Sequence, residues 1–517
     1  MKRRLPLLAG LVAAVAVICA ACMYVSKTPR GVTEHADMKA MHVPCKAHLY
    51  DGSVVLFPKG FSMGGGFFHG SGTRWSLDRA HSYPVSRLAV DSVACLEYFR
   101  HSLQIGPFLA GIAPVAVVAP LLFKALFGSC PTVYTLGGGD WTCEAECFSY
   151  SLAPWNERPD LDRLDYGEVV DGVYAIKLRN EALETHYVNS LALRVVDHPP
   201  GYEAFPDPNR KIVLFGRPSP FLSATDREGR DVLTQISTRD GRWWESDTSR
   251  IRELESGITR DWIDVRFHAP PGAQKMVAAF RLRNTLMTTV YLYDVTLGAQ
   301  GVHALEWMDW GLTDLVRAWS QKDRYTDIFG VRIEPLSGYG NNESFSLGYA
   351  GPICWRLAAV ELPAPEAGTA QLRFSSLPGN WAIDWIGISF DIGRDFTTVE
   401  YGPVHVSGNA STGSDSLAAL LMKSDRRYLV TYPRDAYEIE FHPAPPPQGV
   451  ARSYFIASSG YYIEWIRHDW FAGNHAADIA IYDEDIARTA ALWLEKKESF
   501  EDQFFGTRLA EAGRIQP

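Results

Sequence analysis

The sequence has no excess of basic charge, no internal repeat and few cysteines. Its 50 Lys and Arg residues are outnumbered by 60 Asp and Glu residues, which gives a formal net charge of -10. A surface that neutralises phosphates needs clustered basic residues, so this balance argues against nucleic acid as a partner. No segment recurs at a fixed period, which disfavours solenoids and propellers. The 8 cysteines are modest for 517 residues.

Strand-forming residues are abundant by contrast. The chain has 15 Trp, 23 Tyr and 43 Gly, and Val, Ile and Thr recur between turn residues, a composition typical of β-rich proteins. A hydrophobic fraction of 46% is enough for several packed cores, and the length fits about three or four domains. We therefore expect a mainly β protein.

The amino terminus has the pattern of an export signal or membrane anchor. Three basic residues, Lys2 to Arg4, precede an apolar run from Leu5 to Ala21. Residues 19–22, Cys-Ala-Ala-Cys, resemble a bacterial lipobox in which Cys22 is lipidated. Because Cys19 replaces the usual Leu, ordinary cleavage and a retained helix remain alternatives. We expect residues 1–22 to be the signal or anchor, residues 23–43 to be a tether, and the membrane to be a partner.

Residues 44–100 predict a small β-barrel-like module of about five strands. Short apolar runs flank Asp51-Gly52, the favoured pair for a tight hairpin turn. Residues 60–64, Gly-Phe-Ser-Met-Gly, match the nucleophile elbow of serine hydrolases. That elbow requires a helix directly after the serine, but the Gly-rich residues that follow Ser62 start none. We interpret the motif as a hairpin loop and predict no catalytic residue.

An apolar segment at 104–127 follows the module. Its central part, Ile105 to Phe123, has 19 residues without a charge, which meets the length needed to cross a membrane as a helix. Pro107, Pro114 and Pro120 favour the other interpretation, a buried hydrophobic hairpin. We favour the transmembrane helix on its length.

The remaining residues alternate between apolar and polar, as in residues 174–179 and 263–268. Many short strands of this kind predict antiparallel, jelly-roll-like β-sandwich domains. Helical spacing is clear only from Ala476 to Phe504, with a further candidate from Val302 to Trp319. The expected parts are a β domain at 128–220, a β-sandwich at 221–400, a β segment at 401–474 and a C-terminal helix at 475–517.

Several segments carry a family resemblance. Residues 128–134 read Gly-Ser-Cys-Pro-Thr-Val-Tyr and residues 184–187 read Glu-Thr-His-Tyr. With Tyr174 to Glu181 and Val195 to Gly201, they resemble segments of uncharacterised bacterial envelope proteins, membrane-anchored or lipoprotein-like, over most of the chain from about Val43. The resemblance implies a bacterial origin and a cell-envelope protein. The side of the membrane on which residues 128–517 lie stays open, and we favour the periplasmic or outward-facing side. The resemblance implies no activity, since such proteins have none assigned.

The cysteines outside the signal are candidates for disulfides in an oxidising compartment. Six cysteines can pair in 15 ways, and the sequence does not choose among them. The spacing of Cys130, Cys143 and Cys147 lacks the knuckle and the His pair of common zinc sites, so we predict no metal. A cytoplasmic location would leave free thiols. The six candidates are Cys45, Cys95, Cys130, Cys143, Cys147 and Cys354.

Three other groups suggest ligand sites, each with a structural alternative. Asp160, Asp162 and Asp165 suggest a calcium loop but lack its Gly and Glu, so we favour a solvated turn. Residues 381–391 loosely resemble a strand pair of galactose-binding-like jelly rolls, an analogy of fold alone. Trp381, Trp385 and Asp384 are therefore candidate ligand-binding residues, whereas aromatic residues in strands more often form the core. Tryptophans that could stack on sugars and aspartates that could act in a glycosidase also include Trp307, Trp310, Asp309, Asp314, Asp391 and Asp395.

Two functions of different classes follow. The first is a membrane-anchored envelope protein that binds or scaffolds without catalysis, with a glycan or another envelope protein as its ligand. The second is a hydrolase that acts on polysaccharide through a carboxylate pair. Neither requires a cofactor, and the sequence leans toward the first because no catalytic motif is intact.

Overall fold

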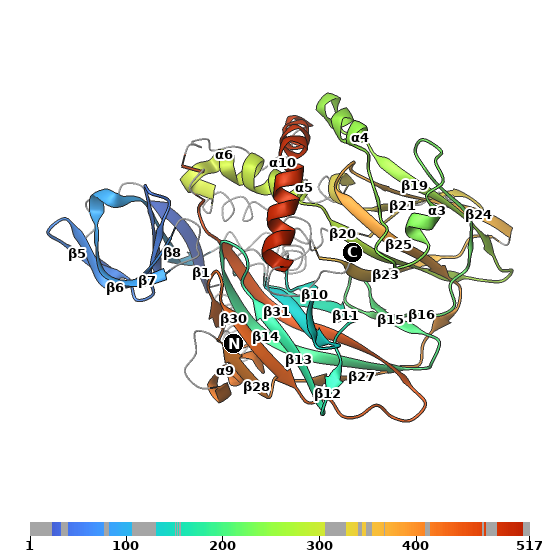
Figure 1. Ribbon diagram of the computed structural model, residues 1–517, viewed down its shortest axis with the longest axis horizontal. Helices are drawn as coiled ribbons and strands as arrows, with labels where there is room; N and C mark the ends of the chain where they lie inside the picture. The colour runs from blue at the N-terminus through green and yellow to red at the C-terminus, as the bar shows by residue number, and fades with distance from the viewer. Residues whose placement is uncertain are drawn as a thin grey trace, which may run out of the picture. The chain divides into compact units, whose positions relative to one another are not determined.

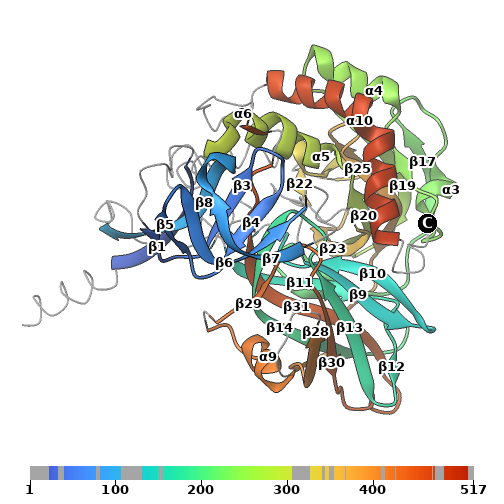
Figure 2. The ribbon, with the colours of Figure 1, turned by 60° about the vertical axis from the view of Figure 1, so that its left-hand side comes forward.

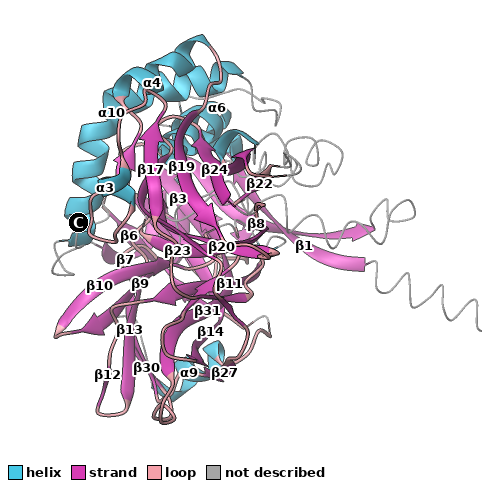
Figure 3. Cartoon of the chain, turned by 90° about the vertical axis from the view of Figure 1, so that its right-hand side faces the viewer, coloured by secondary structure: helices cyan, strands magenta, loops and turns pink. Residues whose placement is uncertain are grey.

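The computed structural model describes residues 23–32, 40–76, 82–105, 131–149, 151, 154, 157–304, 327–339, 344–347, 354–366, 368–408, 414–425, 427–467, 470–471 and 483–509. Antiparallel strands dominate these residues, as the magenta arrows in Figure 3 show, so the expectation of a mainly β protein is confirmed. Residues 1–22 with Cys22, and residues 106–123 of the apolar run, lie outside the described residues. None of the helices in the described ranges is long and apolar enough to cross a membrane.

The chain divides into two compact units. The first comprises residues 1–121, 297–318 and 466–478. Its sheet curves into a half-barrel (Figure 1) around buried side chains such as Ala47, Val55 and Phe68, as expected for the small module. The strand order is β1 (Met23–Val32), β8 (Val93–Ile105), β3 (Cys45–Leu49), β4 (Val54–Phe57), β6 (Phe67–Trp75), β5 (Phe61–Gly64) and β2 (Ala40–Met41), with β7 (Ser82–Ala89) paired to β6.

Two boundaries of this module differ from the sequence interpretation. Residues 23–32, expected within a tether, form β1 and pair along their whole length with residues 96–105 of β8. Since β1 is an edge strand, it needs no apolar alternation and tolerates Pro29. Ile105, expected at the start of an apolar helix, is the last residue of β8.

The serine motif lies in a hairpin. Ser62 is an exposed residue of β5, which pairs with β6 through Ser62 and His69. Gly65 and Gly66 turn the chain between the strands with φ of 60° and 78°, values that favour glycine. A strand therefore follows Ser62 where a nucleophile elbow needs a helix.

The second unit contains a sandwich of two sheets, the outer sandwich. Its strands from residues 132–198 pair with strands from residues 397–464, so strands of the two expected parts 128–220 and 401–474 form one sandwich (Figure 2). Tyr174 and Tyr454 meet between the sheets with ring centroids 4.8 Å apart. The first sheet is β10 (Asp140–Glu146), β9 (Thr132–Gly137), β13 (Val173–Arg179), β30 (Ala436–Phe441) and β28 (His405–Gly408), with β12 (Val169–Val170) on β13. The second is β11 (Arg158–Leu164), β31 (Ala451–Glu464), β14 (Glu184–His198) and β27 (Thr397–Tyr401), with β29 (Leu429–Thr431) on β14.

A second sandwich, the inserted sandwich, lies between β14 and β27 in the sequence. Its two sheets enclose buried Val265, Phe280, Phe374 and Ile386, which confirms the sandwich expected within 221–400. One sheet is β17 (Phe221–Asp226), β19 (Asp261–Ala269), β24 (Gly368–Ser376), β21 (Arg332–Ser337) and β22 (Phe345–Ser346). The other is β18 (Trp244–Glu245), β25 (Trp381–Ser389), β20 (Lys275–Asn284) and β23 (Arg356–Pro363).

A small three-stranded sheet packs against both sandwiches. It consists of β15 (Glu203–Pro206), β16 (Ile212–Phe215) and β26 (Ile392–Gly393). Phe205 and Phe215 pack on Trp385 of β25, and Leu214 packs with Leu161 and Phe455 of the outer sandwich. The sheet that contains β25 is therefore buried on both faces, which explains why every residue of β25 is buried.

Helices cover one end of the inserted sandwich. The C-terminal helix α10 (Asp483–Leu509) confirms the helix expected there, and it buries Ile486, Ala490 and Trp493 among residues of α4, α5 and their neighbours. Residues 305–319 of the other expected helix lie outside the described residues, whereas an unexpected helical stretch starts at Met287. The short helices of this unit include α3 (Leu233–Ile236), α4 (Thr248–Glu253), α5 (Met287–Val290) and α9 (Ser414–Leu421).

Candidate functional site

A small cavity lies where β10 and β11 of the outer sandwich approach β20 and β23 of the inserted sandwich. Its volume is about 30 Å³, which is room for roughly one or two water molecules. Acidic, basic and aromatic side chains line it, so the cavity suits a water molecule or a small polar group rather than an apolar one. The lining residues are Thr142, Cys143, Glu144, Arg163, Asp165, Tyr166, Arg281, Trp355 and Leu357.

Glu144 reaches the cavity because β10 contains a bulge. Cys143 pairs with Tyr134 and Ala145 pairs with Val133, so Glu144 is the extra residue between two ladder positions. A bulge redirects a side chain that regular alternation would place elsewhere. The Glu144 carboxyl accepts hydrogen bonds from the Thr135 hydroxyl and from the backbone N–H groups of Asp165 and Tyr166. Glu144 thereby fixes the turn that follows β11.

The Glu144 carboxyl holds its proton unusually strongly. Burial and, to a smaller extent, the negative charge of Asp165 raise its pKa from 4.5 to about 7, against the hydrogen bonds from Thr135, Asp165 and Tyr166 that lower it. Near neutral pH the group is therefore present in both protonation states. Such a carboxyl beside a cavity is a functional candidate on physical grounds.

Two arginines form the basic wall of the cavity. Arg163 bonds Asp165 at 2.8 Å and Glu203 at 3.0 Å. Arg281 bonds Asp384 at 2.7 Å, and its guanidinium lies 5.0 Å from the ring centroid of Trp355. Because both arginines are already held by carboxylates, they have little freedom to lose when a ligand binds.

The aromatic wall is partly open to solvent. Trp355 is half-buried, and Tyr166 is 43% exposed. The Trp355 ring lies 5.8 Å from that of Trp243, and the Arg283 guanidinium lies 5.2 Å from the first ring and 5.7 Å from the second. These contacts hold the Trp355 ring in place beside the cavity.

A layer of buried charge lies next to these residues. Arg356, the first residue of β23, contacts Asp162 at 3.1 Å and Asp160 at 3.5 Å, and it also donates to the Leu161 carbonyl. Asp160 further accepts the backbone N–H of Phe148 at 3.0 Å. Burial raises the pKa of Asp162 to about 8 against the attraction of Arg356, and the charges of Asp160 and Glu146 raise it too.

This layer corrects the solvated turn that we expected at Asp160, Asp162 and Asp165. The first two are buried residues of β11, paired with Arg356, and only Asp165 lies in the turn beyond it. In the sequence these aspartates look like exposed turn residues, because Arg356, the cation that pairs with them, is distant in the chain. Among the described residues no His, Cys, Asp or Glu cluster is arranged to hold a metal ion.

The ligand-binding candidates from the sequence lie in the core. Trp381 is 1% exposed, Trp385 7% and Asp384 0%. The Trp381 indole donates to the Phe329 carbonyl at 2.8 Å, and Trp385 stacks on Phe205. These positions match the core alternative, and a ligand on the three side chains stays a prediction. Residues 307–314, with the other tryptophans and two aspartates, lie outside the described residues.

The described cysteines are all free thiols. Cys45 and Cys95 belong to the small module, and Cys143, Cys147 and Cys354 belong to the second unit. Cys130 lies outside the described residues, so the predicted pairing of the six stays open. Burial raises the pKa of Cys45 to about 12, so its thiol is protonated at neutral pH.

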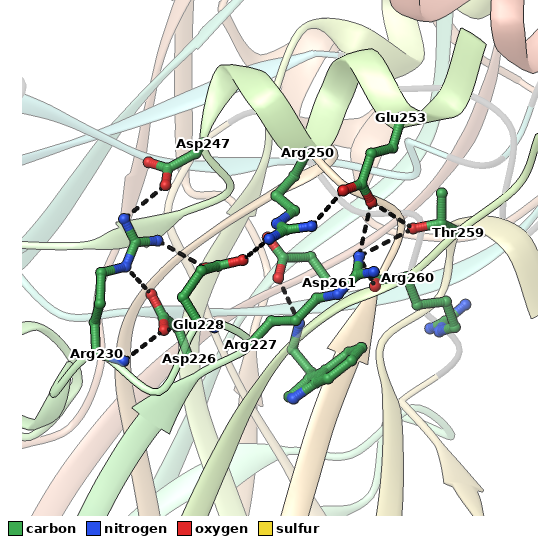
Figure 4. A network of polar contacts seen from close by, with 11 residues as sticks. Asp226, Arg227, Glu228, Arg230, Asp247, Arg250, Glu253, Thr259, Arg260 and Asp261 are labelled. Atoms are coloured by element: carbon green, nitrogen blue, oxygen red, sulfur yellow. Dashed lines mark hydrogen bonds and ion pairs between the residues drawn. The ribbon is translucent and has the colours of Figure 1, made fainter. Parts of the chain in front are cut away.

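A larger polar cluster surrounds α4 (Figure 4) but has a structural role. Arg230 bonds Asp226 and Asp247, and Arg250 bonds both Glu228 and Glu253. These pairs tie the turn after β17 to the helix. Arg230 contacts a third carboxylate, Glu228, so the positive charge of both arginines is already compensated. Exposed ion pairs of this kind each contribute little to stability.

Sequence reasoning missed the cavity residues Glu144, Tyr166, Arg281 and Trp355. They come from segments far apart in the chain, and no local motif joins them. The sequence carries only an indirect signal for them. A charged residue within an apolar strand, such as Arg281 in β20, indicates a buried partner of opposite charge. That partner, Asp384, is itself the extra residue of a bulge in β25.

Comparisons with known proteins do not place the chain in a family. No family model and no curated protein matches it. A solved structure of infectious bursal disease virus, Gx strain, aligns over 93% of this chain and 88% of its own with 9% identity and a TM-score of 0.15. The VP2 subviral particle of infectious bursal disease virus aligns over 94% and 93% with 9% identity and a TM-score of 0.13. Scores this low support no conclusion about fold or function, so a function for the chain has to be inferred from the residues of its own cavity.

Proposed function

We propose that the chain is a membrane-anchored protein of the bacterial cell envelope that binds a glycan without cleaving it. The observation that carries the proposal is the half-buried Trp355 ring beside a polar cavity with the exposed Tyr166. Sugar rings combine apolar faces with hydroxyl edges, so they suit an aromatic surface flanked by hydrogen-bonding groups. Anchoring rests on the amino-terminal sequence pattern, and the envelope location rests on the family resemblance.

The size of the cavity favours contact with one part of a ligand. A volume of about 30 Å³ accommodates one substituent, such as a hydroxyl or carboxylate group, while the ring of the sugar lies outside on Trp355. Arg281 and Glu144 then offer a donor and an acceptor or donor to that substituent. Since Trp355 and Arg281 are already held in place, little side-chain entropy is lost on binding.

Replacing Trp355 with Ala should weaken glycan binding by on the order of tenfold, which corresponds to about 1.4 kcal/mol. The ligand would be found by screening the purified full chain on an array of bacterial surface oligosaccharides, and the affinity measured by calorimetry. Trp262→Ala is the matched control. Trp262 is also half-buried beside two arginines, Arg373 at 4.1 Å and Arg227 at 5.0 Å from its ring centroid, but it lies on β19, away from the cavity.

The proposal fails if the full chain binds no glycan on the array. It also fails if Trp262→Ala weakens binding as much as Trp355→Ala, because the loss would then not arise at the cavity.

A polysaccharide hydrolase is the second candidate, favoured by the Glu144 pKa of about 7. A carboxylic acid that keeps its proton near neutral pH suits general acid catalysis, and the Asp165 carboxylate lies on the same cavity. The three hydrogen bonds that Glu144 accepts give it a structural role instead. Under our proposal the wild-type chain releases no reducing ends from the glycan it binds. If the wild type releases reducing ends and Glu144→Gln does not, the chain is a hydrolase and the binding proposal is wrong.

A further inference from the structure

The strand β27 forms an edge of the outer sandwich and is open to solvent. It is the last strand of its sheet, next to β14, and within the described residues no strand pairs with its outer side. Residues 394–400 are all exposed. An open strand edge presents a row of backbone N–H and C=O groups, which another strand can pair with.

Exposed apolar side chains gather at this edge. Phe396, Val399, Val404 and Met422 are each 40–54% exposed. The Met422 side chain lies directly against Gly402, the residue after β27, so it belongs to the same patch. Single exposed apolar residues are ordinary on a protein surface, whereas a group of them at one place indicates an interaction site.

The edge lacks the features that normally prevent strands from pairing there. Residues 396–401 read Phe-Thr-Thr-Val-Glu-Tyr, without Lys or Pro, and the ladder between β27 and β14 has no bulge. Lysine, proline and bulges are the usual protection of an open edge. Glu400 is the one charged residue of β27, and Arg194 on β14 neutralises it at 2.6 Å.

The side chains of β27 continue two rows that cross the sheet. On one face, Val399 lies opposite Val195, which lies opposite Tyr454, and this row faces the core between the two sheets. On the other face, Glu400 lies opposite Arg194. A strand added at this edge should therefore bring an apolar side chain opposite Val399 and an uncharged hydrogen-bond donor opposite Glu400.

The β27 strand of a second copy meets both requirements. In an antiparallel pair centred on Val399, the two Val399 side chains lie opposite each other, and each Glu400 lies opposite Thr398 of the other copy. The threonine hydroxyl can donate to the carboxylate. A pair centred on Glu400 would oppose two carboxylates, and one centred on Thr398 would place Phe396 opposite Glu400, so the pair centred on Val399 is favoured.

We propose that the chain forms a two-fold symmetric dimer through β27, with the two strands antiparallel and Val399 opposite Val399. The pairing joins the two copies of this sheet into one continuous sheet. A pair of five-residue strands is a small interface, below the roughly 1,200 Å² of standard complexes, so the dimer is weak and forms at high local concentration. It is independent of whether the cavity binds a glycan.

Cross-linking tests the position of the pair. Directly opposite residues of antiparallel strands have Cα atoms roughly 4.5–5.5 Å apart, within the range of a disulfide. Mild oxidation of Val399→Cys, in the full chain purified in detergent, should therefore give a covalent dimer, which peptide mapping locates at residue 399. Thr398→Cys should give little, because residue 398 and its counterpart are offset along the strands beyond that range.

Val170→Cys is the matched control. Val170 is 53% exposed on β12, in the other sheet of the outer sandwich, and Val399 is 47% exposed. The control chain should stay monomeric under the same oxidation. Absence of a covalent dimer of Val399→Cys, or equal linking of Val170→Cys, overturns the proposal.

Sedimentation equilibrium measures the dimer without a cross-link. Val399→Lys places two positive charges opposite each other, so the dissociation constant should rise by about tenfold or more. Lysine is well tolerated at exposed strand edges, and an unchanged melting temperature checks that the fold is kept. Val170→Lys should leave the dissociation constant unchanged.

Two results of the sedimentation experiment contradict the dimer. One is a dimer that Val399→Lys does not weaken. The other is a wild-type chain that stays monomeric at every concentration; if that monomer binds an extended peptide along β27, the edge takes another protein instead of a second copy.

Discussion

Replacing Arg356 with Met is expected to cost about 3–5 kcal/mol of unfolding free energy near pH 8. The substitution removes the cation that contacts Asp160 and Asp162, which are 3% and 2% exposed. Met has a similar length and no charge, so the loss reports the uncompensated carboxylates rather than a large cavity. A denaturant titration of the full chain measures the effect.

The loss should depend on pH. Asp162 has a pKa of about 8 with Arg356 present, and removing the positive charge raises that value. A carboxyl whose folded pKa lies above its unfolded value destabilises the fold increasingly as pH rises through that interval. Below about pH 8 both folded chains keep the Asp162 proton, and above it only the wild type loses that proton, so the cost of Arg356→Met should grow as pH rises above about 8.

The matched control is Arg373→Met. Arg373 also bonds an aspartate, Asp264, at 2.7 Å, but it is 28% exposed on the surface of β24. Breaking such a pair costs about 1 kcal/mol or less. An equal loss in the two variants would show that Arg356 does not balance buried charge.

Replacing Glu144 with Gln is expected to stabilise the fold by about 3 kcal/mol at pH 8 and to change it little at pH 4. The folded pKa of about 7 exceeds the reference value of 4.5. Between those values the folded chain holds a proton that the unfolded chain has lost, so stability falls as pH rises and the full penalty is present above pH 7. Gln does not titrate. Its oxygen can accept the two backbone N–H bonds, and its amide can donate to Thr135.

Unfolding free energies at a series of pH values test this expectation. Glu168→Gln is the control, because Glu168 is exposed near the same turn, and its change should stay within about 0.5 kcal/mol. His186, whose pKa burial lowers to about 3, titrates in every variant, so its effect cancels in the difference. A Glu144→Gln chain that is less stable than wild type at pH 8, or that keeps the wild-type slope, contradicts the argument.

Alternation predicted individual strands well. Residues 173–179 of β13 and 261–269 of β19 alternate in burial as their sequences do. It did not predict β25 correctly, because Asp384 is an extra residue in the ladder. Ile383 and Trp385 are two residues apart, the spacing that puts side chains on one face of a regular strand. They nevertheless lie in different cores on opposite sides of the sheet. A single bulge reverses which residues face which core.

Strand pairing and the cavity were beyond the sequence for a related reason. β14 pairs with β31, and Arg356 pairs with Asp160, across long stretches of chain that no local pattern connects. Asp160 and Asp162 of β11 look like turn residues in the sequence, and only the folded chain shows that Arg356 pairs with them. The cavity needs four such segments at once, so its residues could be recognised only in the folded chain.

The position of the inserted sandwich also has a consequence for synthesis. β14, with buried Leu191, Leu193 and Val195, leaves the ribosome about 250 residues before its partner β31. At about 5–20 residues per second the delay is on the order of 10–50 s. The inserted sandwich is contiguous from β17 to β25 and can fold during that interval, while the apolar edge of β14 stays open to aggregation or chaperone binding.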